Sequence, residues 1–415
     1  MKKKPATKRA ARRTMRPSVT EQPPEPNLDE AVDLVMEMMA IPGRSGEEGK
    51  IVDFLKRRLR KAGIAASALA LDDTPKNSPL GGETGGLVCK FPGTRAAPRR
   101  MLMAHVDTVP LCVGCQPLQK GKFVRSAAKG TGLGADDRAG AAVVLMAALE
   151  IKRQNLPHPP LTLFWPVQEE VGLFGARYVD LELLGQPKLG FNFDGGDSDK
   201  VTIGATGAFR LQITVEGIAS HAGGAPEHGV SAIAIAGKAI AALHEDGWHG
   251  DVNKNGRHGT SNIGVIEGGA ATNVVTDRVA LRAEARSHDP KFRRNIVGAI
   301  ESAFKTAARE VRNVRGKCGK VTITRRLDYE SFLLDQDEPC LLSAERAIAS
   351  IGRDPQRAVT NGGLDANWLS ARGIPTVTIG CGQMHQHTVN ERLNIPVFER
   401  ACRVGLRLAT GWEGE

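Results

Sequence analysis

The segment His105-Val106-Asp107 ends an apolar run that begins at Met101. If this run is a strand, residues two apart point to the same side, so both polar side chains can face a crevice beyond its carboxyl end. A neutral imidazole is a good zinc ligand, and a neighbouring carboxylate can orient it. Taken alone, the pattern has two interpretations. The two residues either belong to a metal site or form an incidental pair.

Two adjacent carboxylates, Asp136 and Asp137, lie within the glycine-rich segment 132–140, which predicts a turn that opens a helix. Acidic residues at a helix N-terminus commonly cap it and interact favourably with the helix dipole. Capping is therefore one interpretation of this pair. The other is that Asp136 bridges two metal ions.

Further acids follow apolar segments later in the chain. Glu169 and Glu170 follow the apolar run 161–167 after a single glutamine, and Asp194 ends the short run 191–194. Acids packed together without a counter-charge raise one another's pKa, so their placement needs a reason. A metal site supplies one, in which one glutamate binds the metal while the other acts as a general base.

A fifth segment, 387–391, follows Gly380-Cys381-Gly382 near the C-terminus and begins with His387. Five separate segments thus each supply a group that can bind a metal, and an α/β sheet would gather them at one edge. The carboxylates of Asp136, Glu170 and Asp194 carry −3, two divalent cations carry +4, and a bridging hydroxide makes the cluster neutral. Imidazole and carboxylate ligands without a thiolate favour Zn²⁺, with Co²⁺ or Mn²⁺ tolerated. In chain order, the five groups are His105, Asp136, Glu170, Asp194 and His387.

Helices and strands alternate in the outer parts of the chain, which predicts an α/β fold with a parallel or mixed sheet covered by helices on both faces. Residues 45–48 fit a capping box that starts a helix. The predicted helices are 27–40, 139–151, 338–351 and 397–410, and the predicted strands are 87–91, 101–107, 161–167, 191–194 and 376–379.

The middle of the chain has a different pattern, which predicts an inserted α+β unit over 208–328. Its predicted strands are 209–216, 263–267, 280–285 and 321–324, with helices at 231–244 and 293–311. We therefore expect a catalytic, metal-binding domain made of 27–207 and 329–415 and interrupted by this unit.

Residues 1–26 are basic and proline-rich and contain almost no large apolar side chain, so we expect a disordered tail. Eight Lys or Arg against two Glu give this tail +6 of the net charge of +10. A solvated extension is the favoured interpretation. Weak association with nucleic acid or an anionic surface, or a transit peptide, are the alternatives.

The rest of the composition is that of a globular protein without a membrane span, because no apolar run of about 18 residues occurs. Seven scattered cysteines argue for a reducing compartment, and we expect the cytoplasm. The pair Cys112 and Cys115 has no second such pair that would complete a closed zinc site, so we interpret it as structural.

The motifs around these residues resemble the two-metal exopeptidase and deacylase family that includes peptidase T, carboxypeptidase G and the succinyl-diaminopimelate desuccinylases. The resemblance runs from about residue 27 to 412 and is greatest to the peptidase T branch. It implies a zinc-exopeptidase catalytic domain with an inserted ferredoxin-like lid or dimerisation domain. The motifs are MAHVDT (103–108), GADDRAG (134–140), QEEVGL (168–173), GIASHAG (217–223), ATNVV (271–275) and GGLDAN (362–367).

The resemblance implies a division of the metal ligands between two ions. By this resemblance, His105, Asp136 and Asp194 would hold one ion, and Asp136, Glu170 and His387 would hold the other. His385, two residues earlier, is the alternative to His387, and the Thr-x-Asn-Glu sequence that follows His387 favours the latter.

The same resemblance implies further roles. Glu169 would be the general base, and Asp107 would orient a metal ligand. The inserted domain would form a homodimer and lend His221 to the partner's site, although a plain loop histidine is the alternative. Asn273 and Arg286 would contact substrate; Arg286 suits a carboxylate through its fork of donors, and a solvated strand residue is the alternative.

The function implied is two-metal-dependent hydrolysis of amide bonds in small peptides, with a tripeptide aminopeptidase as the first expectation. The alternative is a carboxypeptidase or N-acyl amino acid deacylase of the same family. A metal-dependent binding protein without activity would lack a ligand or the base, and none is missing. A membrane partner is not expected, and nucleic acid is disfavoured.

Overall fold

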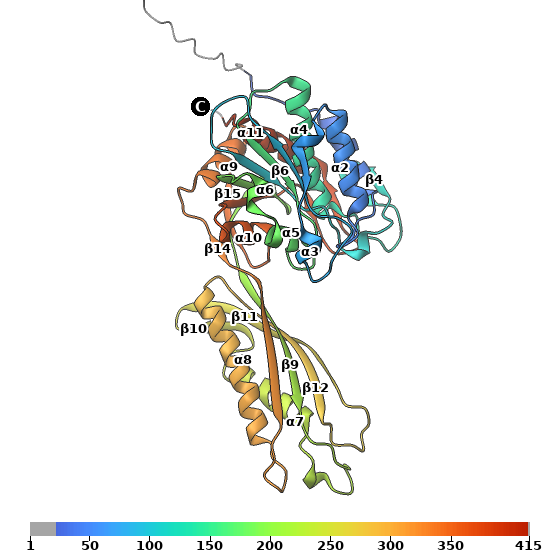
Figure 1. Ribbon diagram of the computed structural model, residues 1–415, viewed down its shortest axis with the longest axis vertical. Coiled ribbons are helices and arrows are strands. Elements are labelled where there is room, and N and C mark those ends of the chain that lie inside the picture. Colours follow the sequence, from blue (N-terminus) through green and yellow to red (C-terminus); the bar gives the residue numbers. More distant parts are fainter. Residues whose placement is uncertain (1–21, 414–415) are drawn as a thin grey trace, which may run out of the picture.

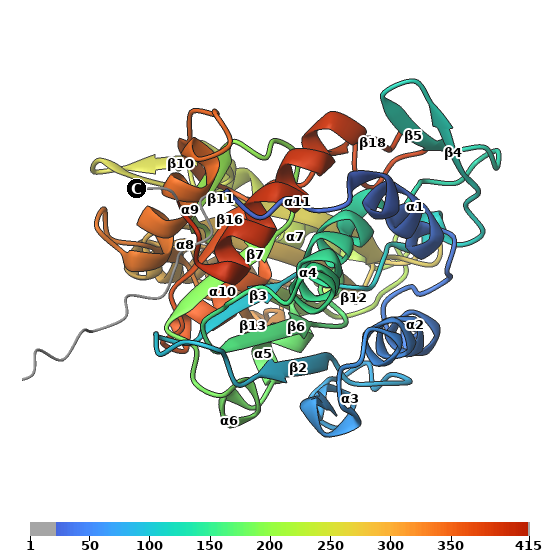
Figure 2. The same cartoon turned by 90° about the horizontal axis from the view of Figure 1, so that it is seen from above.

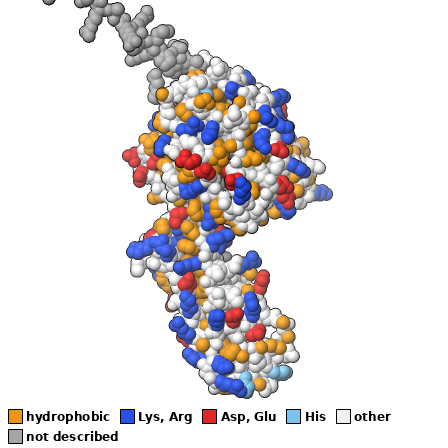
Figure 3. Space-filling view, viewed as in Figure 1, with side chains coloured by type: hydrophobic (Ala, Val, Ile, Leu, Met, Phe, Trp, Pro, Cys, Tyr) orange, Lys and Arg blue, Asp and Glu red, His pale blue; other side chains and the backbone are white. Residues whose placement is uncertain are grey.

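A computed structural model describes residues 22–413 as two lobes stacked along the long axis of the molecule (Figure 1). The larger lobe contains both ends of the described chain. The smaller lobe is built from the middle of the sequence, and the molecule narrows to a waist between the two (Figure 3). Most of the predicted basic tail, residues 1–21, lies outside the described residues.

A mixed sheet of nine strands forms the centre of the larger lobe. Its strands are β1 (Leu69–Leu71), β2 (Leu87–Phe91), β3 (Arg100–Met103), β6 (Leu161–Trp165), β7 (Leu189–Phe193), β8 (Lys200–Ala205), β14 (Phe332–Leu333), β15 (Gln356–Thr360) and β16 (Thr376–Ile379). The order is β1-β2-β6-β3-β7-β16-β8-β14, with β15 also paired to β8. Strands β6, β3, β7 and β16 are mutually parallel, so their carboxyl ends meet at one edge.

Helices cover both faces of this sheet (Figure 2). One layer packs into the main core and comprises α1 (Leu28–Met39), α2 (Gly49–Lys61), α4 (Ala135–Gln154), α9 (Pro339–Ala349) and α11 (Ile395–Thr410). The opposite layer comprises α5 (Phe174–Tyr178), α6 (Leu181–Leu184) and α10 (Asp365–Ala371), with the short α3 (Thr74–Asn77) close to α5. No helix in residues 22–413 is long and apolar enough to cross a membrane.

A small sheet at the side of the larger lobe joins two segments that are distant in the sequence. Its strands, in spatial order, are β17 (Gln383–Met384), β18 (Arg392–Asn394), β5 (Phe123–Ser126) and β4 (Pro117–Lys120). Strands β4 and β5 precede Asp136 in the chain, and β17 and β18 flank His387. The sheet therefore brings the segments that carry these two residues together.

The smaller lobe is a five-stranded antiparallel sheet with two helices on one face (Figure 1). Its elements are β9 (Gly207–Glu216), α7 (Ala232–Glu245), β10 (Gly250–Lys254), β11 (Arg257–Gly268), β12 (Arg278–Ser287), α8 (Pro290–Glu310) and β13 (Lys320–Tyr329). The order is β10-β11-β12-β9-β13. Without β10, this is a ferredoxin-like β-α-β-β-α-β unit, and the apolar face of its sheet packs on α7 and α8 while the other face stays polar.

The predicted α/β fold with a mixed sheet is confirmed, and the ends of several elements differ from the prediction. The strand predicted at 101–107 ends at Met103, and the helix predicted at 139–151 begins at Ala135. The chain beyond β3 continues alongside β6, because the N–H of Ala104 bonds to Phe164 in β6 and the N–H of Val106 bonds to Pro166 directly after it. This extension carries His105 past the sheet.

The predicted capping box at 45–48 is wrong. Helix α2 begins directly after it and has no side-chain cap at its N-terminus. The Ser45 hydroxyl instead donates to Asp107 Oδ2 at 2.6 Å, and the buried Glu48 carboxylate accepts the N–H of Gln168 at 3.1 Å. Both side chains point to the loops at the sheet edge rather than to the helix end.

Part of the predicted tail packs on the larger lobe. Glu25 pairs with Arg403 at 2.9 Å and with Arg407 at 2.5 Å, both in α11. Its carbonyl oxygen accepts a hydrogen bond from Gln154 at the end of α4. The folded part of the chain therefore begins before residue 27.

Helix α4 packs so closely on β7 that only glycine fits at position 140. A Cβ atom on Gly140 would lie 2.0 Å from the carbonyl oxygen of Phe193 and 2.6 Å from Asp137 Oδ1. We expect Gly140→Ala to lower the free energy of unfolding by roughly 2 kcal/mol, because overpacking forces the helix from the sheet. Chemical denaturation measures this change.

The matched control is Gly298→Ala in α8, where an added Cβ meets no atom within 4 Å. There we expect a gain of roughly 1 kcal/mol, since alanine is the better helix former. Equal effects of the two substitutions would contradict the close approach of α4 to β7.

Candidate metal centre

A cavity of about 1100 Å³ lies between the lobes at the carboxyl edge of the central strands. The smaller lobe closes it with residues of β9, β11, β12 and β13, and the segment 362–364 contributes from the larger lobe. Six of the predicted metal-binding and catalytic residues line it, and they are His105, Asp136, Glu169, Glu170, Asp194 and His387. The remaining one, Asp107, is fully buried next to His105.

These side chains are positioned by the ends of strands and by the N-terminus of one helix. His105 follows β3, Glu169 and Glu170 follow β6, and Asp194 comes directly after β7. Asp136 lies at the N-terminus of α4, where its backbone is not helical (φ −82°, ψ 106°). This departure from helical geometry aims the carboxylate toward the strand ends rather than along the helix.

Asp136 lies between two histidines and presents one carboxylate oxygen to each. Its Oδ1 is 3.2 Å from His105 Nε2, and its Oδ2 is 3.4 Å from His387 Nε2. Glu170 approaches the second histidine as well, with its Oε2 2.9 Å from His387 Nε2. A carboxylate that faces two imidazoles in this way has the geometry of a bridge between two cation sites.

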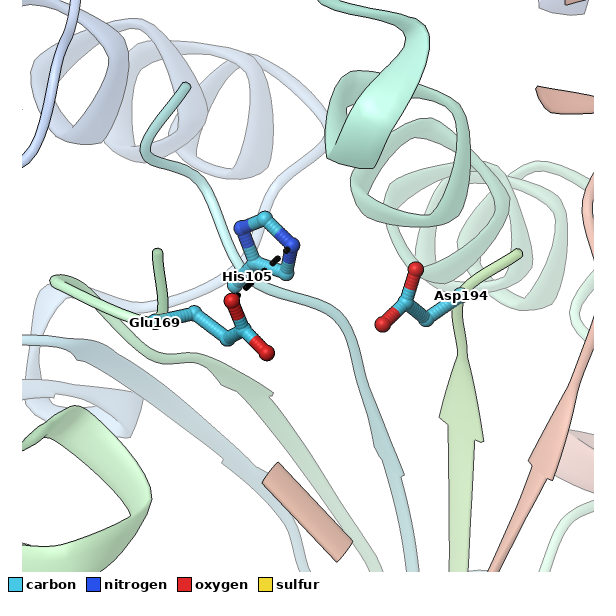
Figure 4. A group of neighbouring side chains, drawn as sticks. All are labelled: His105, Glu169 and Asp194. Carbon is cyan, nitrogen blue, oxygen red and sulfur yellow. Dashed lines mark ion pairs between the residues drawn. The ribbon is translucent and has the colours of Figure 1, made fainter. Parts of the chain in front are cut away.

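His105, Glu169 and Asp194 form a second grouping (Figure 4). Each offers one ligand atom, and these atoms all lie within 4.8 Å of one another. His105 lies between the two acids, and Glu169 Oε2 is 4.0 Å from His105 Nε2. The same criterion groups His105 with Asp136 and Glu170. His105 therefore stands where both groupings meet.

The buried carboxylate of Asp107 fixes the loops on which these ligands lie. Its Oδ1 accepts the N–H of Glu169 at 2.9 Å, and its Oδ2 accepts the N–H of Glu170 at 3.2 Å and the Ser45 hydroxyl at 2.6 Å. The same group lies 3.4 Å from His105 Nδ1. One anion thus orients the imidazole and clamps the segment after β6 against the segment after β3.

The pKa values of the clustered groups respond to burial and to one another. Burial raises the pKa of Glu169 well above its ordinary value, and burial together with the Asp136 carboxylate raises the pKa of Asp194 to about 7. For Asp136 the effect of burial is outweighed by hydrogen bonds from the two histidines, so its pKa is lowered. Bonds to Asp136 and Glu170 raise the pKa of His387 to about 10. The acids and histidines behave as a cluster that needs positive charge.

The residues present fit a pair of divalent cations. Within residues 22–413, the ion-pair partners of Asp136, Glu169 and Glu170 are histidines, and no Lys or Arg neutralises them. Close by, both carboxylate oxygens of the buried Asp365 lack a hydrogen-bond partner. Carboxylates and imidazoles without a thiolate are the donor set of Zn²⁺, Co²⁺ or Mn²⁺ sites.

Glu391 was not among the predicted site residues, although it lies in the Thr-x-Asn-Glu sequence. Its buried carboxylate accepts the backbone N–H groups of Leu133 at 2.8 Å, Gly134 at 2.7 Å and Asp136 at 3.0 Å. Four residues earlier in the same loop is His387. One side chain therefore joins the segment of the bridging carboxylate to the segment of a histidine ligand.

Asp137 is a second residue that the predicted site lacks. It is fully buried, and its Oδ1 accepts from the N–H of Gly140 at 2.9 Å and from Gln383 Nε2 at 2.7 Å. Of the two interpretations for the adjacent acids, Asp137 matches a helix-capping role, while Asp136 faces the histidines. Cys112 and Cys115 are buried thiols; Cys112 Sγ lies 3.4 Å from Glu391 Oε2.

The predicted substrate-binding residues fall in two places. Arg286 lines the cavity, where it donates to Glu284 at 3.0 Å and to the carbonyl oxygen of Asn361 at 3.2 Å. His221 and Asn273 lie on adjoining segments of the smaller lobe, are exposed, and do not line the cavity of this chain. A role for His221 in a partner's site stays a prediction.

Fold and site together define a two-lobed protein with a clustered carboxylate and imidazole centre in the cleft. The family model described as Peptidase family M20/M25/M40 matches residues 101–411, and the chain belongs to this family. The protein YqjE of Bacillus subtilis is 31% identical over 361 residues, which cover 87% of this chain and 92% of the relative.

Two solved structures are similar along nearly the whole chain. A tripeptidase from Staphylococcus aureus has a TM-score of 0.84 at 31% identity, with 93% of this chain and 98% of the other covered. The aminopeptidase PepT from Bacillus cereus has a TM-score of 0.82 at 31% identity and the same coverage. The resemblance to a peptidase T-like member of the family is thereby confirmed.

Substituting Glu391→Gln should weaken metal binding. The amide keeps the size of the side chain but turns an N–H donor toward backbone N–H groups, so the segment of Asp136 loses its anchor. We expect about a 10- to 100-fold loss of metal affinity, as for other residues that orient metal ligands. Metal titration followed by calorimetry measures it.

Glu267→Gln, an exposed carboxylate in β11, is the control and should bind metal like the unaltered chain. A Glu391→Gln protein with a lower melting temperature but unchanged metal affinity would mean that Glu391 only stabilises the fold.

Proposed function

We propose that the chain is a two-metal-dependent aminopeptidase that cleaves tripeptides, with zinc as the metal. The observation that carries this proposal is the Asp136 carboxylate with one oxygen toward each of two histidines, at the carboxyl edge of a sheet. The likeness to a tripeptidase and an aminopeptidase at 31% identity supports the choice of substrate. Co²⁺ or Mn²⁺ suits the same donors.

The ligands divide between two ions in this proposal. Asp136 belongs to both sites. His105 and Asp194 complete one of them, and Glu170 and His387 complete the other. His387 is preferred to His385 because it lines the cavity and lies beside Glu170, whereas His385 does not line the cavity.

Glu169 is the proposed general base. When bound, the cations supply Lewis acidity, which makes a water molecule more acidic and polarises the scissile carbonyl. Glu169 lines the cavity, and within the described residues its carboxylate accepts no hydrogen bond, so it can take a proton from water and pass it to the leaving amine. Its backbone N–H bonds to Asp107, which keeps the side chain at the edge of the cluster.

Substrate binding would involve both lobes. The cavity is of the size that takes a small peptide. Arg286 reaches it from the smaller lobe and has a guanidinium fork that suits a carboxylate. Closure of the lobes on a peptide would remove water from the scissile bond.

The division of the chain and its assembly are part of the same proposal. We divide it into a catalytic domain of 27–207 and 329–415 and an inserted domain of 208–328. The inserted domain pairs with a second copy, whose site receives His221; Asn273 lies beside His221 and would act there too. The seven free cysteines support a reducing compartment, the cytoplasm.

A substrate panel tests the activity. We expect the zinc-loaded protein to release the N-terminal residue from an unblocked tripeptide and to leave the N-acetylated tripeptide intact. Chromatography of the products together with metal analysis checks both points, and two metal ions per chain are expected. Preferred cleavage of N-acetyl or N-succinyl amino acids would replace this proposal by a deacylase.

Glu169→Gln tests the general base. The amide keeps the shape of the side chain but cannot accept the proton, so we expect kcat to fall by about 10²- to 10⁴-fold while two metal ions remain bound. Steady-state kinetics and metal analysis on the same sample separate the two effects. Unchanged kcat would assign proton transfer to another group, and loss of metal would make Glu169 a ligand.

A further inference from the structure

The wall of the cavity that belongs to the smaller lobe is rich in arginine. It is the polar face of the five-stranded sheet, on the side away from α7 and α8. We call this surface the cleft wall, and its charged members are Arg210, Arg282, Glu284, Arg286, Arg326 and Asp328. Four guanidinium groups against two carboxylates give it a net charge of +2.

Both acids of the cleft wall already pair with arginine. Glu284 accepts from Arg210 at 2.6 Å and from Arg286 at 3.0 and 3.1 Å. Asp328 accepts from Arg210 at 2.9 Å and from Arg326 at 2.7 Å. Every oxygen of the two carboxylates therefore already accepts at least one hydrogen bond from an arginine.

Of the four arginines of the cleft wall, Arg282 pairs with neither Glu284 nor Asp328. Across the strands it faces Gln212 on β9 and Val265 on β11, neither of which carries charge. Within residues 22–413 no carboxylate lies within ion-pair distance of it, and its side chain is exposed to the cavity. A free guanidinium is thus presented to whatever occupies the cleft.

The opposite wall does not provide the missing negative charge. Asp136, Glu169, Glu170 and Asp194 carry −4 together, and two divalent cations carry +4 in the proposed function. An unblocked tripeptide with neutral side chains is a zwitterion and leaves the +2 of the cleft wall uncompensated. A substrate with an acidic side chain lowers this excess.

We propose that Arg282 binds an acidic side chain of the substrate, so that the chain favours tripeptides containing Glu or Asp. This rests on the proposed function, since it names the substrate class of the same site. A guanidinium binds a carboxylate through two parallel hydrogen bonds, which are stronger than bonds between neutral groups. Such a contact in a partly open cleft is screened by salt, so the preference shrinks as ionic strength rises.

The experiment compares pairs of tripeptides that differ only by Glu or Gln at one position, with each of the three positions tested. At one position we expect kcat/KM for the Glu peptide to exceed that for the Gln peptide about tenfold, and Arg282→Gln to abolish this ratio. Arg278→Gln is the control, because Arg278 is an exposed arginine on the same strand that does not line the cavity.

Equal rates for Glu and Gln peptides in the unaltered chain, or a ratio that survives in Arg282→Gln, would overturn the inference. Cleavage of the Gln peptides tests the proposed function separately. If no tripeptide is cleaved, calorimetric binding of the same pairs to the zinc-loaded Glu169→Gln protein decides the matter. Tighter binding of the Glu peptide that depends on Arg282 supports the inference, and equal affinities overturn it.

Discussion

Repulsion between buried carboxylates is the constraint on which the architecture of the cleft depends. Carboxylates that lie close together repel one another, so they become protonated or move apart unless positive charge lies among them. The chain opposes separation by fixing the backbone that carries each acid. Asp107 binds the N–H groups of Glu169 and Glu170, and Glu391 binds three N–H groups before and at Asp136. Two buried anions that accept backbone N–H groups thus hold in place the anions that face the cavity.

The two lobes divide the charge of the cleft. The larger lobe contributes the acids and imidazoles, and the smaller lobe contributes four arginines on the polar face of its sheet. A ferredoxin-like unit suits this task, because its helices cover one sheet face and leave the other free for side chains that contact a ligand.

The sequence predicted the strand-end residues best, for a physical reason. His105, Glu170 and Asp194 each follow an apolar run that must be a buried strand, and the carboxyl ends of parallel strands meet at one edge. Asp136 and His387 do not follow such a strand: Asp136 was predicted from a glycine-rich turn that opens a helix, and the family motif favoured His387 over His385. The hydrogen bonds that join distant segments around the site were not predictable in the same way. Ser45 and Glu48 have the spacing of a capping box, and only the fold reveals that they point to residues 107 and 168.

Short elements were missed for a related reason. β4, β5, β17 and β18 are two to four residues long, too short for their periodicity to be read, and they exist because their partners are held nearby. Glu391 follows β17 and precedes β18, and its role depends on pairing between segments more than 250 residues apart. Such contacts have no local signature, so a single sequence carries no pattern for them.

Glu169 and Glu170 show how one backbone feature gives neighbouring identical residues different environments. Both N–H groups point to the same carboxylate, that of Asp107, which turns the two side chains along different paths. Glu170 Oε2 lies 2.9 Å from His387 Nε2 and pairs with it, whereas Glu169 Oε2 lies 4.0 Å from His105 Nε2. Glu169 thus lies at the edge of the cluster, near its charges but, among the described residues, without a fixed hydrogen-bond partner. An acid in this position is able to exchange protons. The proposed division into ligand and base therefore follows from where Asp107 holds the backbone, and not from the chemistry of the two side chains.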